Sequence, residues 1–163
     1  MKWDKGTQRA HGLIEVKSFD DSKRTFKGIA STITPDRMGD IVESKGAQFS
    51  LPLPLLWQHD KNQPIGWDTK AIVKDDQIEV EGELAQIDEP PSLKDQLDVA
   101  WAKLKAKLVR GLSIGFVPQE WSDIKNSYGL RFTKWDWIEL SAVTIPANSE
   151  ATIQMVRSCD VGA

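Results

Sequence analysis

Apolar and polar residues alternate along several stretches of this chain, which is the pattern of half-buried β-strands. In residues 77–85, Ile78, Val80, Gly82 and Leu84 fall on one face, while glutamates occupy the other. This alternation predicts an antiparallel strand with one exposed face. Similar runs predict further strands at residues 11–17, 25–33, 55–58, 67–73, 112–121 and 130–145.

One stretch has helical rather than strand spacing. Its apolar residues recur every three or four positions, at Leu93, Leu97, Ala100, Trp101, Leu104 and Leu108. Ser92 precedes them as a candidate N-cap, and Gly111 follows them as a candidate terminator. The spacing predicts an amphipathic helix over residues 93–109.

These elements together predict an α+β fold that is mainly β. We expect a closed or near-closed antiparallel β-barrel with helices packed outside it. The chain has 163 residues, which suits a single domain with a full hydrophobic core. The core of that domain is expected between residues 11 and 157.

Composition narrows the classes of function. The formal net charge is -3, so no general attraction to nucleic acid or to an anionic membrane is expected. No apolar run reaches the length of a membrane span, and the first residues lack the apolar region of a secretory signal. Cys159 is the single cysteine, which excludes an internal disulfide and favours a reducing compartment.

A serine lies between two glycines where the predicted helix gives way to a strand, in Gly111-Leu112-Ser113-Ile114-Gly115-Phe116. Two interpretations of this stretch stay open. Small neighbours would let a substrate backbone approach Ser113, as a nucleophilic serine requires. Alternatively, Gly111 ends the helix, Gly115 marks a bulge, and Ser113 has no chemical role.

A serine nucleophile needs a base within hydrogen-bond reach, and the chain has 2 histidines. His11 lies on a predicted N-terminal strand among polar residues, which favours a surface role. His59 follows the apolar run at residues 55–58, so its backbone would be anchored while its ring faces a cleft. Taken alone, His59 could be a loop histidine bonded to nearby carboxylates, but together with Ser113 it is the candidate base.

An acid that orients the histidine would complete the set. Strict alternation along residues 135–145 places Glu139 on one side with Trp135 and Trp137, a poor environment for an unpaired carboxylate. Glu139 would therefore need a partner. That partner is either His59 or one of the 21 lysines and arginines.

Other acids and other chemistries have less support. Asp136 faces away from Glu139 in this alternation, whereas Asp40 and Asp60 lie on predicted loops that would hold a ring less rigidly. The sequence has no metal-ligand motif and no glycine-rich phosphate loop, so no metal or cofactor is expected. The Gly-x-Ser-x-Gly spacing around Ser113 matches a nucleophile elbow only by its letters, because here a helix leads into a strand.

Four motifs together resemble the prohead (capsid maturation) serine proteases of tailed bacteriophages, which are distantly similar in fold to the herpesvirus assemblins. The motifs cover residues 26–148. They are Phe26-Lys27-Gly28-Ile29-Ala30-Ser31 with Asp36-Arg37-Met38-Gly39-Asp40-Ile41-Val42, Leu55-Leu56-Trp57-Gln58-His59-Asp60 with Pro64-Ile65-Gly66, Gly111-Leu112-Ser113-Ile114-Gly115-Phe116, and Glu139-Leu140-Ser141-Ala142-Val143-Thr144-Ile145-Pro146-Ala147-Asn148. The order of histidine, serine and third member matches the assemblins, with Glu139 where assemblins carry a second histidine.

The resemblance implies a serine endopeptidase. Ser113 would be the nucleophile, His59 the general base and then acid, and Glu139 the group that orients His59. By analogy with assemblins, main-chain N–H groups of Ala147 and Asn148 would form the oxyanion hole.

The resemblance also implies partners and a location. The substrate would be the major capsid protein with its scaffolding segment, and then the enzyme itself, inside the immature capsid in the cytoplasm of the bacterial host. No cofactor, nucleic acid or membrane is implied. A homodimer is an open alternative, because assemblins gain activity on dimerising. Two other functions stay open: a non-catalytic β-barrel module that binds capsid or scaffold, and a serine esterase.

Overall fold

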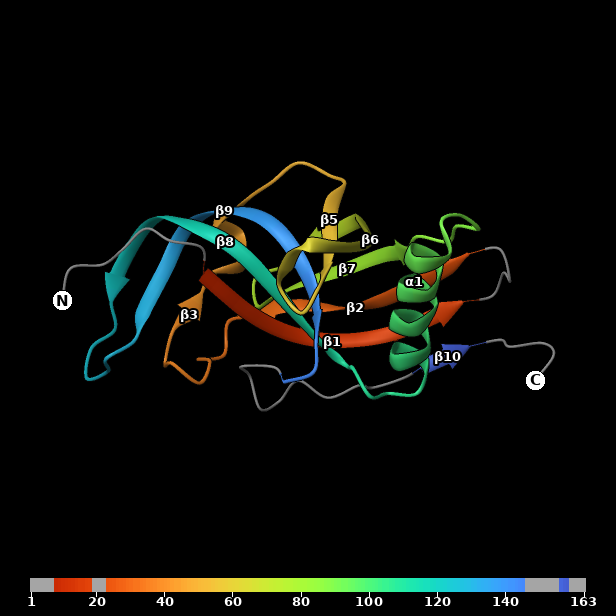
Figure 1. Ribbon diagram of the computed structural model, residues 1–163. Helices are drawn as coiled ribbons and strands as arrows, with labels where there is room; N and C mark the ends of the chain where they lie inside the picture. Colours follow the sequence, from red (N-terminus) through yellow and green to blue (C-terminus); the bar gives the residue numbers. More distant parts are fainter. Residues whose placement is uncertain (1–7, 19–22, 146–155, 159–163) are drawn as a thin grey trace.

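The computed structural model describes residues 8–18, 23–145 and 156–158, and it describes side chains within 23–145. These ranges form a 10-stranded sheet, one α-helix and one turn of 3-10 helix (Figure 1). In chain order the elements are β1 (Gln8–Ser18), β2 (Arg24–Thr32), β3 (Ile41–Val42), η1 (Ser44–Gly46), β4 (Ala47–Gln48), β5 (Leu53–Trp57), β6 (Asp60–Val73), β7 (Gln77–Leu84), α1 (Pro91–Lys105), β8 (Gly111–Asp123), β9 (Leu130–Val143) and β10 (Val156–Ser158).

The order of strands in the sheet differs from their order in the chain. The run β1-β2-β7-β6-β5-β9 is continuous, and β8 pairs with both β9 and β1. The prediction of a purely antiparallel sheet is wrong, because β3, β4 and β5 run parallel to β9, and β10 runs parallel to β1. A parallel pair needs a crossover, and the long connection from β5 through α1 and β8 to β9 supplies one. The fold is therefore a mixed, mainly β sheet with one helix.

The alternation seen in the sequence sets the two faces of β7. Ile78, Val80, Gly82 and Leu84 are buried, and the residues between them are half-buried. These apolar side chains join one continuous core with residues of the other strands and of α1. Removal of each buried apolar side chain from water stabilises such a core by about 1.5–3 kcal/mol.

The helix begins and ends earlier than its spacing predicts. α1 starts at Pro91, whose fixed φ suits the first helical position, so Ser92 lies inside the first turn and is not the N-cap. It ends at Lys105, and Lys107 adopts a left-handed φ of 62° that prevents continuation. Gly111 is the first residue of β8 and does not terminate the helix.

The molecule is elongated, with different elements at its two ends (Figure 1). The β8–β9 hairpin reaches one end, and α1 lies at the other end beside β10. An ion pair of 2.6 Å between Arg24 of β2 and Asp98 attaches α1 to the sheet. In the described part of the chain, no helix combines the length and apolar character that would span a membrane.

A β-bulge in β9 changes which of its side chains share a face. Gly115 pairs with Glu139, but Phe116 pairs with Trp137, so Ile138 has no partner in the β8–β9 ladder. Ile138 is 42% exposed, whereas Trp137 is buried in the core. Glu139 therefore lies on the opposite face of β9 from Trp135 and Trp137. The prediction from strict alternation, which placed all three residues on one face, is wrong.

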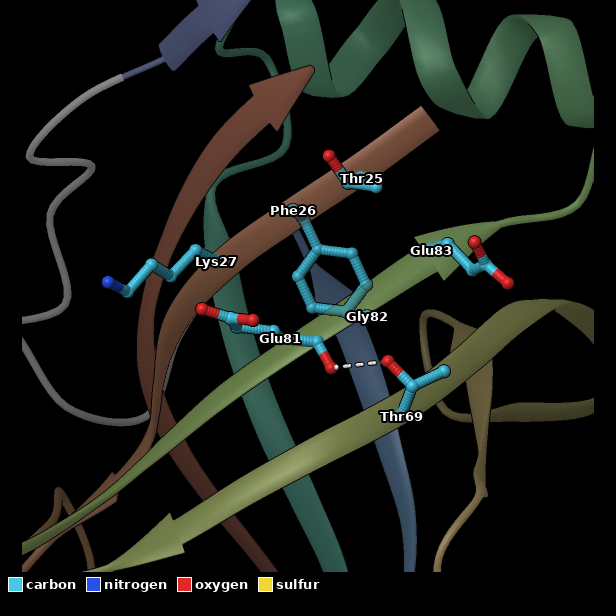
Figure 2. A pocket seen from close by; sticks show the side chains of 7 residues that line it. All are labelled: Thr25, Phe26, Lys27, Thr69, Glu81, Gly82 and Glu83. Carbon is cyan, nitrogen blue, oxygen red and sulfur yellow. Dashed lines mark hydrogen bonds between the residues drawn. The ribbon is translucent and has the colours of Figure 1, made fainter. Parts of the chain in front are cut away.

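The pairing of β6 with β7 also shifts in register, between Asp68 and Lys70. The hydroxyl of Thr69 donates to the main-chain oxygen of Glu81 at 3.2 Å, as Figure 2 shows. Asp68 is fully buried, and neither of its carboxylate oxygens has a hydrogen-bond partner among the described residues. Burial raises the pKa of Asp68 from 3.8 to about 7, and the nearby main-chain N–H of Lys70 offsets this only in part.

Candidate active site

His59 lies at the tip of a tight turn between β5 and β6. Trp57 pairs with Asp60, so Gln58 and His59 are the only two residues of the loop. Both have positive φ, 54° and 61°, which is the geometry of the two-residue turns that match strand twist. The prediction that a buried strand delivers His59 at its end is confirmed, because β5 ends two residues earlier.

The ring of His59 is bound to Glu139. Its Nδ1 lies 2.9 Å from Oε1 of Glu139, and the two side chains are only 8% and 10% exposed. A carboxylate only accepts, so Nδ1 carries the proton in the neutral ring and Nε2 carries the lone pair. This tautomer can accept a proton from a nucleophile through Nε2.

The second oxygen of Glu139 has its own donor. The hydroxyl of Ser141 donates to Oε2 at 2.5 Å, and both groups are buried. The indole N–H of Trp137 donates to the main-chain oxygen of Glu139 at 2.8 Å, which fixes the backbone beside the bulge. A carboxylate with both oxygens bonded has one defined orientation, so Glu139 can hold the ring of His59 in place.

Gly115 makes the position of the Glu139 side chain possible. It lies directly opposite Glu139 on β8. A Cβ atom at position 115 would lie 2.1 Å from Oε1 of Glu139 and 2.6 Å from its Cγ. The carboxylate therefore lies over β8, in the space that a side chain at position 115 would occupy.

Ser113 lies on the same face as Glu139. It is opposite Ser141 of β9, and side chains of directly opposite residues share a face. Ser113 is fully buried, and its Oγ has no hydrogen-bond partner among the described residues. The structure thus joins His59 to Glu139 directly, and the register places Ser113 on the face of Glu139 without a hydrogen bond to either residue.

The remaining acids weighed from the sequence have other partners. Asp136 accepts from Gln119 at 2.8 Å, and Asp60 accepts from the main chain of Asn62 at 2.9 Å. Asp40 accepts from the main chain of Leu130 at 2.8 Å. Burial raises the pKa of the Asp40 carboxyl, and this hydrogen bond opposes the shift. None of these contacts involves His59.

Two residues of the site were missed by sequence reasoning, namely Ser141 and Gly115 as supports of Glu139. Both stand in the motifs, but their roles depend on the cross-strand register. The register also places His11, for which we expected a surface role, opposite Ser113. Ala147 and Asn148, the predicted oxyanion residues, lie outside the described residues.

The larger hollows described on the surface lie outside this cluster. One of about 240 Å³ lies over β2, β7 and β6, with the ring of Phe26 and the hydroxyl of Thr69 in its lining (Figure 2). Another of about 330 Å³ lies between α1 and Trp57, where Nζ of Lys103 is 5.8 Å from the indole centroid. Neither includes Ser113, His59 or Glu139. Within the ranges that the structure describes, no group of three His, Cys, Asp or Glu side chains could hold a metal ion.

The chain is similar to known phage proteins along most of its length. It is 58% identical over 154 residues to the capsid polyprotein of Pseudomonas phage PAJU2, which covers 94% of this chain. The chain spans only 23% of that relative. It is 24% identical over 156 residues to the prohead protease of Escherichia phage T5, covering 88% of this chain and 70% of the relative.

A solved structure supports the fold. The capsid assembly protease of bacteriophage T4 matches with a TM-score of 0.57 at 12% identity, covering 85% of this chain and 97% of that chain. The model of one family, described as caudovirus prohead serine protease, matches residues 11–161. The chain therefore belongs to the caudovirus prohead serine protease family.

Proposed function

We propose that this chain is a serine endopeptidase in which Ser113, His59 and Glu139 form the catalytic triad. The observation that carries the proposal is the 2.9 Å contact between His59 Nδ1 and Glu139 Oε1, on the same face as Ser113. Membership of the prohead serine protease family supports the class of reaction. Burial of both side chains supports a defined geometry rather than a solvated contact.

The mechanism is acyl transfer. Ser113 Oγ attacks the carbonyl carbon of the scissile bond while its proton passes to Nε2 of His59. Glu139 stabilises the imidazolium through Nδ1–H, and Nε2 then returns the proton to the leaving amine. Water, deprotonated by His59, attacks the acyl-enzyme and releases Ser113. Substrate binding must expose Ser113 Oγ and bring it to Nε2, since catalytic hydrogen bonds often tighten only in the complex.

The proposed substrate is the major capsid protein with its scaffolding segment. The similarity to a capsid polyprotein supports this choice, because in that phage a matching segment is part of one chain with capsid sequence. The enzyme then cleaves its own chain, and both reactions take place inside the immature capsid in the host cytoplasm. Main-chain N–H groups of Ala147 and Asn148 are proposed to bind the oxyanion.

We also infer that the sheet closes into a barrel and that the chain is a single protease domain. The pairing of β8 with both β9 and β1 supports closure, because it links the two ends of the run β1-β2-β7-β6-β5-β9. A barrel has no open edge along these strands. The nucleophile would then lie on an interior strand, and substrate would cross the face of the sheet rather than extend it.

The test is co-expression of this chain with the capsid precursor from the same genome, followed by intact-mass analysis of both proteins. We expect the wild-type chain to shorten the precursor, and Ser113→Ala and His59→Ala to leave it intact. Glu139→Gln should slow cleavage by about 10³–10⁴-fold, as loss of the orienting acid does in other triads. Ser122→Ala, an exposed serine of the same strand, is the matched control and should cleave normally.

Three outcomes would contradict the proposal. A precursor that stays full-length with the wild-type chain, both in co-expression and in purified procapsids, indicates a binding module without catalysis. Loss of cleavage in His11→Gln together with normal cleavage in His59→Ala would assign the base to the other histidine. Ester hydrolysis without cleavage of any precursor would indicate the esterase alternative.

A further inference from the structure

The turn that carries His59 is unfavourable on its own. Gln58 and His59 both adopt left-handed backbone conformations, which residues other than glycine rarely take. Such a conformation persists where the surrounding structure holds it in place. The holding contacts of this turn therefore bear on how steadily His59 faces Glu139.

Gln58 supplies these contacts. Its main-chain N–H donates to the oxygen of Ala142 at 2.9 Å. Its side-chain amide makes a two-point contact with Thr144: Nε2 donates to Oγ1 at 2.5 Å, and Oε1 accepts from the main-chain N–H at 3.1 Å. An amide that donates and accepts at once fixes its orientation as well as its distance.

The partner of Gln58 lies on the same strand segment as the partner of His59. Glu139 binds the ring of His59, and Thr144 binds the preceding residue one position after the end of β9. The two adjacent turn residues are thus attached to one segment at points five residues apart. Rotation of the turn would break both attachments, so the Gln58 clamp restrains the ring.

We propose that Gln58 is a positioning residue for the general base, acting through its two-point clamp on Thr144. The inference rests on the proposed function, since it assigns His59 as the base. The clamp also ties the base to the segment that continues toward Ala147 and Asn148. Precise placement of a reacting group carries much of the rate, and a displacement of about 1 Å costs about 100-fold.

The competing explanation is that the clamp only stabilises the fold. Gln119 allows the two to be separated, because its Nε2 donates to Oδ2 of Asp136 at 2.8 Å, between β8 and β9, the strand that also carries Glu139. Gln119→Ala removes a side-chain hydrogen bond of the same kind without touching the His59 turn. It is the matched control for Gln58→Ala.

The experiment measures labelling of Ser113 by a peptidyl phosphonate in the full chain, with the maximal rate and the half-saturating concentration determined separately. We expect Gln58→Ala to lower the maximal rate by about 10- to 100-fold with little change in the half-saturating concentration. Gln119→Ala should label like wild type at a similar melting temperature. Thr144→Val should be slowed, and Thr144→Ser should be restored because it keeps the hydroxyl.

Two further measurements sharpen the result. The double variant Gln58→Ala/Thr144→Val should be no slower than Gln58→Ala alone, because the two residues form one contact. The imidazole nitrogen spectrum, assigned with His59→Asn, should show a protonated Nδ1 in wild type and Gln119→Ala and a mixture of tautomers in Gln58→Ala.

The outcomes distinguish the role of Gln58 from the proposed function of the chain. A labelled wild type with equally fast labelling of Gln58→Ala contradicts the role of Gln58 and leaves the triad in place. A wild-type chain that takes up no label contradicts the proposed function, and the inference fails with it. Equal rate losses in Gln58→Ala and Gln119→Ala would show that the clamp is only structural.

Discussion

The carboxylate of Glu139 depends on two neighbours that have no chemical role of their own. Gly115 leaves the space in which the carboxylate lies, and Ser141 donates to the oxygen that does not face His59. A buried carboxylate without these supports would move toward water or lose its charge. The site therefore needs free space and a hydrogen-bond donor around Glu139 as well as the three residues of the proposed triad.

Gly115→Ala tests the need for room. The new Cβ would lie 2.1 Å from Oε1 of Glu139, so the carboxylate must move away from His59. We expect precursor cleavage to fall by about 10²-fold or more, with a stability loss of about 1–3 kcal/mol from overpacking. Cleavage rate and urea unfolding measure the two effects.

Ile114→Val is the control for this prediction. Ile114 is the preceding residue of β8, is buried in the core and faces away from Glu139. The substitution should cost about 0.5–1.5 kcal/mol of stability without slowing cleavage. If Gly115→Ala cleaves as fast as Ile114→Val, the carboxylate does not need the space that the glycine leaves.

At the scale of elements, the sequence predicts the strands better than their relative positions. The alternation of β7 and the apolar run of β5 are confirmed, because each follows from burial of one segment. Strict alternation fails in β9 because the bulge at Ile138 adds a residue on one strand only. No pattern within β9 reveals a bulge that depends on its register with β8.

The same holds for the site, where residues could be selected from the sequence but their relative positions could not. Ser113, His59 and Glu139 could be selected by residue type and order, and the structure joins the last two. The roles inferred for Gln58, Ser141 and Gly115 could not be selected, because each depends on a partner on another strand. The helix start was missed for a local reason, since Pro91 at the first helical position outweighs Ser92 as a cap.

The attachment of α1 to the sheet gives a testable property of that element. Asp98 binds Arg24 at 2.6 Å and Lys94 at 2.5 Å, and these cations lower the pKa of the Asp98 carboxyl. A lowered pKa means that the stabilisation is present above the ordinary pKa of aspartate and is lost as the pH falls through the lowered value.

We therefore expect Asp98→Asn to lower the melting temperature at pH 7 by about 2–4 °C. The difference from wild type should shrink as the pH falls below the ordinary pKa of aspartate and through the lowered value. Asp95→Asn, an exposed position of the same helix, is the control and should change little. A difference that stays constant from pH 7 to pH 3 would show that the ion pairs do not attach the helix.

At the scale of the whole molecule, one buried acid opposes folding. Asp68 has a carboxyl without a hydrogen-bond partner among the described residues, and burial raises its pKa to about 7. The folded state then keeps its proton between about pH 4 and 7 while the unfolded state releases it. Wild-type stability therefore falls over this range and stays reduced above it.

Asp68→Asn should remove this penalty. Each unit of pKa corresponds to about 1.4 kcal/mol, so the variant should gain up to about 4 kcal/mol over wild type at pH 8 and little at pH 4. Urea unfolding at both pH values measures the gain. Asp76→Asn, an exposed aspartate of the β6–β7 turn, should show no such dependence. An equal gain at pH 4 and pH 8 would exclude a titrating carboxyl as its cause.

The contact between Gly115 and Glu139 also limits how this protein can diverge. Every amino-acid replacement at position 115 brings a Cβ, so none can leave the position of the Glu139 carboxylate unchanged. A shorter acid at position 139 would open the space but would no longer span the distance to His59. Loss of the glycine therefore disturbs the contact with His59 whichever acid stands at position 139, so each of these two positions limits what the other can become.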